Sequence, residues 1–434
     1  MKLKKNKVND MNKLLGCLLM ATVATTSFAQ GSTNSPYSQY GFGEAAPEGV
    51  GFNRAMNGLG VALHRGNQVN PLNPASYASV DSLTFLFDMG LSGQITNMNE
   101  NGIKQNAKSA SFDYVLGSFR AWKNVGVTFG VLPITNVGYD YYSSTFLPEV
   151  QTRVVQTYEG DGGLHQLFIG AGWRVLKPLS IGVNAGYLWG GFDRGVTTSN
   201  SSSANDLTKL YSATVHNYNL SFGLQYDQKI GKSDLLTIGL TYDYGHSLKS
   251  DAECLIVSDN TSLTKADTTK YVCKDALELP HAFGAGFSYT HGSQWLVGAD
   301  IRAQLWGQTK FPDYQNNAYV TKSDLLKDSY KFTVGGEYCP RWNSRRFLDR
   351  IRYRLGAGYS TPYYYINGKD GPRQLSVSAG FGIPIMNGYN SRSMLNISAQ
   401  WVNNNADGFI KENTFRINIG LTFNEKWFAK WKVE

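Results

Sequence analysis

The stretch Thr414 to Phe423, TFRINIGLTF, alternates strictly between two kinds of side chain. Because successive side chains on a β-strand point to opposite faces, such a segment has one apolar face and one polar or small face. The same pattern occurs in LSVSAGFGI, which begins at Leu375, and in LNISAQW, which begins at Leu395. The C-terminal part of the chain is therefore predicted to consist of two-faced strands.

The same alternation predicts about fourteen strands, each roughly ten residues long, the length that a tilted strand needs to cross a bilayer. Short links at 121–124, 175–179, 228–234 and 290–293 alternate with long polar links at 133–163, 191–212, 246–277 and 306–327. The expected strands lie near 83–92, 109–121, 124–132, 164–175, 179–190, 213–228, 234–245, 278–290, 294–305, 328–339, 350–360, 374–384, 393–402 and 413–423.

This arrangement is typical of an outer-membrane barrel, in which short turns lie on one side of the membrane and long loops on the other. A soluble sandwich or solenoid is the alternative, but it rarely keeps strands this long over a whole chain. No segment after residue 29 has the roughly 18 consecutive apolar residues of a membrane helix. The fold class expected is all-β: a transmembrane antiparallel β-barrel of about 14 strands with an N-terminal plug, or hatch.

The ends of the chain suggest export. Residues 1–29 combine a basic start, an apolar run and the small-residue site SFA, which predicts a signal peptide. Its removal takes away five Lys and one Asp, so the formal charge falls from +8 to +4. Such a small excess gives no reason to expect nucleic acid as a partner. The expected location is the outer membrane of a Gram-negative bacterium, with outer-membrane lipid as surroundings.

Residues 30–82 precede the first strand and are rich in Gly, Asn and Pro. Since about fourteen strands enclose a space too wide for their own side chains to fill, this segment is expected to plug the barrel of residues 83–423. Residues 424–434, NEKWFAKWKVE, form an expected periplasmic tail that lies at the membrane interface or meets a partner. Aromatic residues near strand ends are candidates for the interface girdles, namely Tyr139, Tyr141, Tyr142, Tyr363, Tyr364, Tyr365, Trp427 and Trp431.

Three N-terminal stretches carry a family resemblance: SPYSQYGFGE from Ser35, RAMNGLGVAL from Arg54 and LNPASYASVDSLTF from Leu72. They resemble the N-terminal region of the FadL/TodX-type outer-membrane transporters of hydrophobic compounds, in a divergent form found in Bacteroidetes-like bacteria. That family implies a barrel of fourteen strands whose hatch carries an Asn-Pro-Ala motif. The motif is matched here by Asn73, Pro74 and Ala75.

The resemblance also implies a mechanism, in which the hatch changes conformation and substrate leaves sideways at a kink in the third strand. The third expected strand, VGVTFGVLP, contains Gly126, Gly130 and Pro133, which weaken strand pairing and are candidates for a lateral gate. The other interpretation is that these glycines are ordinary small inward-facing residues, as they are elsewhere in this chain.

Two functions follow from the resemblance. One is passive uptake of a hydrophobic small molecule, of the long-chain fatty acid or aromatic type. However, the polar faces carry Gly, Ser, Asn and Gln, with no long apolar row that would line a greasy channel. The alternative is a FadL-like barrel that does not transport and instead acts as accessory scaffold of an outer-membrane assembly or secretion complex, with an outer-membrane or periplasmic protein as partner.

Enzyme chemistry is not expected. His165 follows Asp161, and His246 follows Asp243, but no nucleophile elbow, His-Glu-x-x-His motif or phosphate loop accompanies them. No catalytic residue, cofactor or metal is therefore assigned. Cys254 and Cys273 share one polar link, and an exported setting allows a loop disulfide between them.

Overall fold

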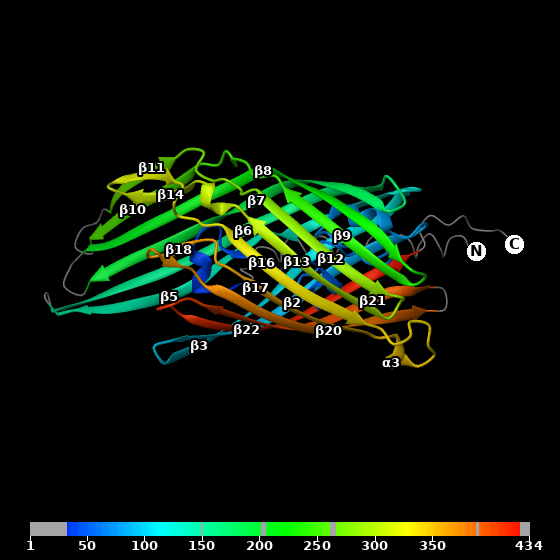
Figure 1. Ribbon diagram of the computed structural model, residues 1–434. Helices are drawn as coiled ribbons and strands as arrows, with labels where there is room; N and C mark the ends of the chain where they lie inside the picture. The colour runs from blue at the N-terminus through cyan, green and yellow to red at the C-terminus, as the bar shows by residue number, and fades with distance from the viewer. Residues whose placement is uncertain (1–32, 149–150, 201–204, 261–265, 388–389, 426–434) are drawn as a thin grey trace, which may run out of the picture.

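The computed structural model describes residues 33–148, 151–200, 205–260, 266–387 and 390–425, and it contains a closed barrel of 14 antiparallel strands (Figure 1). Each strand pairs with the next, and β2 closes the ring by pairing with β22 from Phe85↔Glu425 to Asn99↔Lys411. All fourteen expected strands are present, so the fold-class prediction is confirmed. They are β2 (Phe85–Glu100), β3 (Ile103–Trp122), β4 (Val125–Pro133), β6 (Thr152–Arg174), β7 (Leu179–Asn200), β8 (Asn205–Ile230), β9 (Asp234–Asp243), β12 (Ala282–His291), β13 (Trp295–Gln304), β16 (Ser329–Tyr338), β17 (Arg352–Ser360), β20 (Arg373–Asn387), β21 (Asn390–Asn405) and β22 (Lys411–Glu425).

The two faces of the strands divide between lipid and lumen. On β22, Phe415 and Ile417 are each 47% exposed, whereas Asn418 and Thr422 on the other face are 4% and 0% exposed. The apolar rows thus point outward and the polar or small rows point inward, as a lipid-facing barrel requires. Short turns gather at the right-hand end of Figure 1, and long strands extend at the left-hand end, which is the extracellular end by the rule for such barrels.

The long links are more ordered than the sequence indicated. They form β5 (Thr135–Leu147), β10 (Ala252–Asn260) and β11 (Asp267–Cys273), which join the barrel sheet above the membrane, and the hairpins β14 (Phe311–Gln315) with β15 (Ala318–Lys322) and β18 (Tyr365–Ile366) with β19 (Lys369–Asp370). The short helices η4 (Trp306–Gln308) and α3 (Phe347–Arg350) complete the connections. Among the described residues, no helix has the length and apolarity to span a bilayer.

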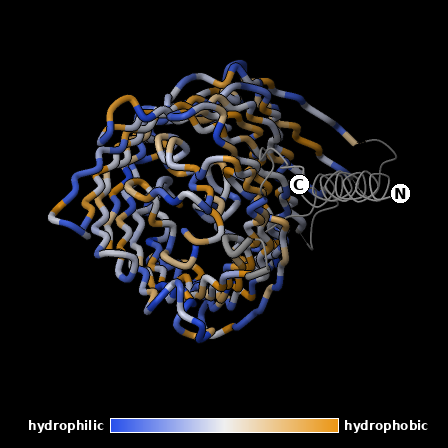
Figure 2. The backbone as a smooth tube through the Cα atoms, turned by 90° about the vertical axis from the view of Figure 1, so that its right-hand side faces the viewer, coloured by the Kyte–Doolittle hydropathy of each residue, from blue (hydrophilic) through white to orange (hydrophobic). Residues whose placement is uncertain are grey.

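The segment before the barrel folds back into its interior. It contains η1 (Pro36–Gln39), β1 (Glu44–Ala45), α2 (Gly51–Arg54) and η2 (Pro74–Ser79), with irregular chain between them. Figure 2, which views the barrel along its length, shows chain crossing the space inside the ring of strands. We call residues 33–82 the plug. The expected signal peptide and most of the expected tail lie outside the described residues.

Candidate functional site

The Asn-Pro-Ala motif organises one end of the plug. Asn73 caps η2, because its Oδ1 accepts a hydrogen bond from the backbone N–H of Ala75 at 3.0 Å. Its Nδ2 donates to the carbonyl of Val61 in the plug at 2.7 Å, and it also lies 3.2 Å and 3.3 Å from the carbonyl oxygens of Leu224 and Leu240 in the wall. One fully buried amide therefore joins η2, the middle of the plug and two barrel strands.

Glycines in the barrel wall allow the plug to lie directly against it. A Cβ added to any of them would come within 3.0 Å of plug atoms, a separation that real Cβ atoms essentially never show. Any side chain here would push the plug away from the wall. The glycines and the plug residues that they touch are Gly126 with Tyr77, Gly172 and Gly182 with Pro74, Gly223 with Asn73, Gly239 with Val61, Gly356 with Met56 and Gly380 with Ala55.

A buried ion pair holds the α2 end of the plug. The guanidinium of Arg54 pairs with the carboxylate of Asp113 on β3, and both side chains are only 5% exposed. Arg54 also donates to Oδ1 of Asn418 at 3.3 Å, and it lies over the ring of Tyr114 at 5.3 Å. The hydroxyl of Tyr114 in turn accepts from the N–H of Gly51 at 2.7 Å, which adds a second contact at the start of α2.

A second ionic cluster surrounds Glu337 on β16. Its carboxylate receives Arg65 from the plug at 2.7 Å, and Arg352 and Arg354 from β17 at 2.6 Å and 2.7 Å. Arg354 is 0% exposed and donates onward to Oδ1 of Asn396 at 2.6 Å. Because three arginines surround one carboxylate, the cluster has a net positive charge, and a neutral acceptor such as Oδ1 of Asn396 helps to stabilise it.

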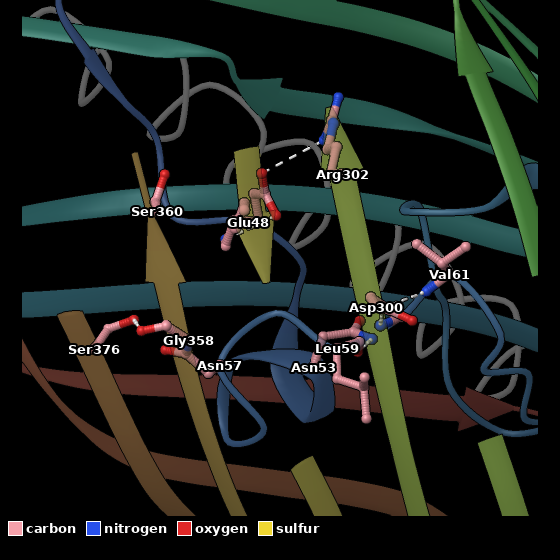
Figure 3. A network of polar contacts seen from close by, with 12 residues as sticks. Glu48, Asn53, Asn57, Leu59, Val61, Asp300, Arg302, Gly358, Ser360 and Ser376 are labelled. Atoms are coloured by element: carbon pink, nitrogen blue, oxygen red, sulfur yellow. Dashed lines mark hydrogen bonds and ion pairs between the residues drawn. The ribbon is translucent and has the colours of Figure 1, made fainter. Parts of the chain in front are cut away.

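A third cluster lies where the plug meets β13 (Figure 3). Glu48 accepts from Lys331 at 2.9 Å and from Arg302 at 3.4 Å. Burial alone raises the pKa of Glu48, but the charges on Lys331 and Arg302 outweigh it and lower the pKa to about 2. On the same strand, Asp300 accepts from the backbone N–H groups of Gly60 and Val61 at 2.7 Å and 2.9 Å.

The barrel wall has a break beside β4. β4 pairs with β3 only from Val131↔Val115 to Val125↔Trp122. Above Pro133, β6 pairs with β5 instead of β4. In the described part of the chain, no strand pairs with Ile103–Asp113 of β3 on the side where β4 pairs lower down. The plug occupies the lower part of the break, where β1 pairs with β5 through Glu44↔Asn136 and Ala45↔Thr135.

Side chains of the plug cap both edges of this break. The hydroxyl of Ser38 bonds the backbone N–H and C=O of Gly138 on β5, at 3.1 Å and 3.2 Å. Across the break, Asn34 donates to the carbonyl of Lys108 on β3 at 3.2 Å. A cavity of about 450 Å³ lies at the break and is lined by residues from both sides, including Asp113 and Asn136.

Aromatic rings mark the height of the break. His165 stacks on Trp189, Trp189 on Tyr187 and Tyr187 on His216, with ring centroids 5.7, 6.3 and 6.2 Å apart. Such rings define a membrane interface. Pro133, the last residue of β4, pairs with His165 on β6, whereas the pairing of β4 with β3 ends at Val131, so the break begins at the height of these rings.

The three predicted gate residues therefore lie in two different environments. Gly126 and Gly130 each have a partner on β3 and on β6, so they lie within closed wall. Gly126 faces Tyr77 of the plug. Pro133 does lie where the third strand leaves its neighbour, at the lower corner of the break.

The expected disulfide is not formed, since Cys254 and Cys273 are both buried free thiols. In the β10–β11 register Cys254 lies opposite Tyr271, and Cys273 lies opposite Ala252. The two cysteines are thus offset by two residues, and diagonal neighbours of this kind lie about 7–8 Å apart, too far for the usual disulfide geometry. Among the described residues, no group of three or more His, Cys, Asp or Glu is placed to hold a metal.

Sequence reasoning missed the ionic clusters. Their signal was present, because Asp113 and Glu337 are acids on strand faces that otherwise carry small or polar residues. An inward carboxylate in a plugged barrel needs a cation nearby, and the plug contains Arg54 and Arg65. Which cation meets which anion depends on contacts between residues far apart in the sequence.

Solved FadL-type barrels share the fold of this fourteen-stranded barrel. The Pseudomonas putida toluene transporter TodX has a TM-score of 0.60 at 13% identity, covering 89% of this chain and 100% of that one. The Ralstonia pickettii toluene transporter TbuX has a TM-score of 0.57 at 15% identity, covering 87% of this chain and 98% of that one. A Pseudomonas aeruginosa FadL homologue has a TM-score of 0.58 at 12% identity, covering 88% of this chain and 99% of that one. At such identities the likeness shows the fold.

The sequence model of the BamG family matches residues 11–434, so the chain belongs to the BamG family. No curated protein matches it. The closed barrel with its apolar outward face agrees with the predicted location in the outer membrane of a Gram-negative bacterium. The prediction that it is not an enzyme agrees with the transporters named above.

Proposed function

We propose that this barrel is a sealed scaffold of the outer membrane that supports a protein assembly or secretion complex. The observation that carries the proposal is the attachment of the plug. It contacts the wall through the buried Arg54–Asp113 pair, through the bond from Arg65 to Glu337, and at wall glycines on seven different strands, β4, β6, β7, β8, β9, β17 and β20. A plug held on so many sides resists displacement.

Three ionic clusters join the plug to the barrel wall. Removing one partner from a buried ion pair costs about 3–5 kcal/mol, because the other charge stays buried alone. Withdrawing the plug would break the contacts of Arg54, Arg65 and Glu48 together. The Arg54–Asp113 pair, in which both side chains are 5% exposed, accounts for about 3–5 kcal/mol of this cost, and an apolar ligand forms no contacts that replace those of the separated charges.

A second candidate function, passive uptake of a hydrophobic small molecule, is favoured by a different observation. A cavity of about 260 Å³ between plug and wall is lined partly by apolar side chains, among them Phe42, Leu132, Ile134 and Leu188. It lies beside Pro133 and the break, so a small aromatic or acyl compound could leave sideways there without full withdrawal of the plug. The toluene transporters of the same fold make this class of substrate the natural choice for a test.

One experiment separates the two functions. The protein is purified from its native outer membrane in mild detergent, and co-purified proteins are quantified by mass spectrometry. The same protein is reconstituted in liposomes for uptake of toluene and of a long-chain fatty acid. The scaffold proposal expects a stoichiometric protein partner and uptake no faster than in empty liposomes. Saturable uptake by a barrel without any partner would establish the channel and overturn the scaffold.

A further inference from the structure

Both edges of the wall break offer backbone hydrogen-bonding groups. In an antiparallel strand the N–H and C=O of one residue point to the same side, and the side alternates along the strand. Gly138 bonds Ser38 in the break, and Asn136 pairs there with Glu44. Even-numbered residues of β5 therefore direct their main-chain groups into the break, which includes Asp140, Tyr142 and Ser144.

The plug leaves the upper part of this edge unpaired. Residues 140 and 142–147 of β5 are exposed, and in the described chain β6 is the one strand that pairs with them. An exposed edge of this length is a template for another strand, and natural proteins normally protect it. The lower part of the same edge already accepts a strand, since β1 pairs with it.

The surface beside this edge is acidic. Asp140 lies opposite Glu159, and Asp161 lies opposite Asp193. Because opposed residues share a face, and residues two apart on one strand do too, all four carboxylates project from the same outer face. All four are exposed, and they line a surface hollow of about 590 Å³. The β3 edge differs, because it carries Lys104 and Lys108.

We propose that the upper edge of β5 is a docking site for an extended, basic segment of a partner protein, which adds to the sheet as an antiparallel strand. Backbone bonds to Asp140, Tyr142 and Ser144 supply the pairing, and Lys or Arg side chains of the segment face the four carboxylates. The proposal rests on the scaffold function above, and it assigns the site at which the partner is held.

The test uses the full chain in its native bacterium. Ser144→Pro removes an N–H that points into the break while leaving the β6 pairing intact, and Ser144→Ala is the matched control. Amide hydrogen exchange is measured in the native complex and in the isolated barrel. We expect the amides of Asp140, Tyr142 and Ser144 to exchange about 100-fold more slowly in the complex, and the proline variant to lose the partner.

A charge test accompanies it. Asp140→Lys is expected to lower partner retention about tenfold, whereas Asp259→Lys, an exposed acid on β10 away from the break, leaves retention unchanged. A partner that co-purifies while the β5 amides exchange as in the isolated barrel overturns the docking site but not the scaffold. If no partner co-purifies, the scaffold itself is wrong. If the pairing strand belongs to a second copy of this chain, the proposed partner is wrong.

Discussion

Substitution of Gly126 by Ala tests whether this glycine seats the plug or works as part of a gate. The new Cβ would lie less than 3.0 Å from the backbone oxygen and carbon of Tyr77. Backbone atoms within η2 cannot move aside as a flexible side chain can, so η2 must shift as a unit. Overpacking of this kind costs about 1–3 kcal/mol, and a backbone contact places the cost near the upper value.

The assay is amide hydrogen exchange over η2, with Gly93→Ala as control. An added Cβ at Gly93 meets nothing within 4 Å, so the two variants share the change in backbone freedom and differ in the contact with the plug. A cost of about 3 kcal/mol makes the η2 amides exchange about 150-fold faster in Gly126→Ala. Equal exchange rates of the η2 amides in Gly126→Ala and Gly93→Ala would refute the idea that Gly126 makes room for the plug.

Three further predictions concern single groups. Arg54→Ala is expected to destabilise the plug by about 3–5 kcal/mol and to lower the thermal unfolding midpoint, while the double variant with Asp113→Leu recovers most of the loss. Because the pKa of Glu48 is lowered to about 2 in the folded protein, the ionised carboxylate stabilises the plug fully above about pH 4.5, and this stabilisation is lost as the pH falls toward 2. Amide hydrogen exchange of the plug, measured over that pH range, should show this dependence. Glu48→Gln should abolish it. Cys254 and Cys273 should both react with maleimide in denaturant without reductant, and an unreacted pair would contradict the structure.

The barrel could be predicted from the sequence because lipid imposes a local rule on it. Each strand within the bilayer must show apolar residues outward, so residues such as Phe415 and Ile417 give a period of two that needs no knowledge of the rest of the fold. Above the bilayer both faces of a strand meet water or protein. The polar sequence of β5 therefore has no such signature, and its pattern predicts a link and not a strand.

The aromatic residues show the same limit. Tyr363 and Tyr364 were expected at the membrane interface, yet they lie inside the barrel end. The hydroxyl of Tyr363 accepts from the N–H of Phe42 at 3.1 Å, and Tyr364 is 6% exposed. A tyrosine near a strand end suits either place, because its ring is apolar and its hydroxyl needs one partner. Long-range contacts with the plug decide between them, and local sequence does not contain those contacts.

The scaffold and the channel make opposite demands on the same part of the molecule. A channel needs the plug near Pro133 to yield to an apolar ligand, so weakening the plug should increase transport. A scaffold needs a fixed plug, because residues 34–45 cap the lower edges of the break and so set the height at which β5 becomes free for a partner. Gly126→Ala loosens η2 without touching the break, so the two functions predict different results for this variant. Faster uptake of toluene supports the channel, whereas unchanged partner content without uptake supports the scaffold.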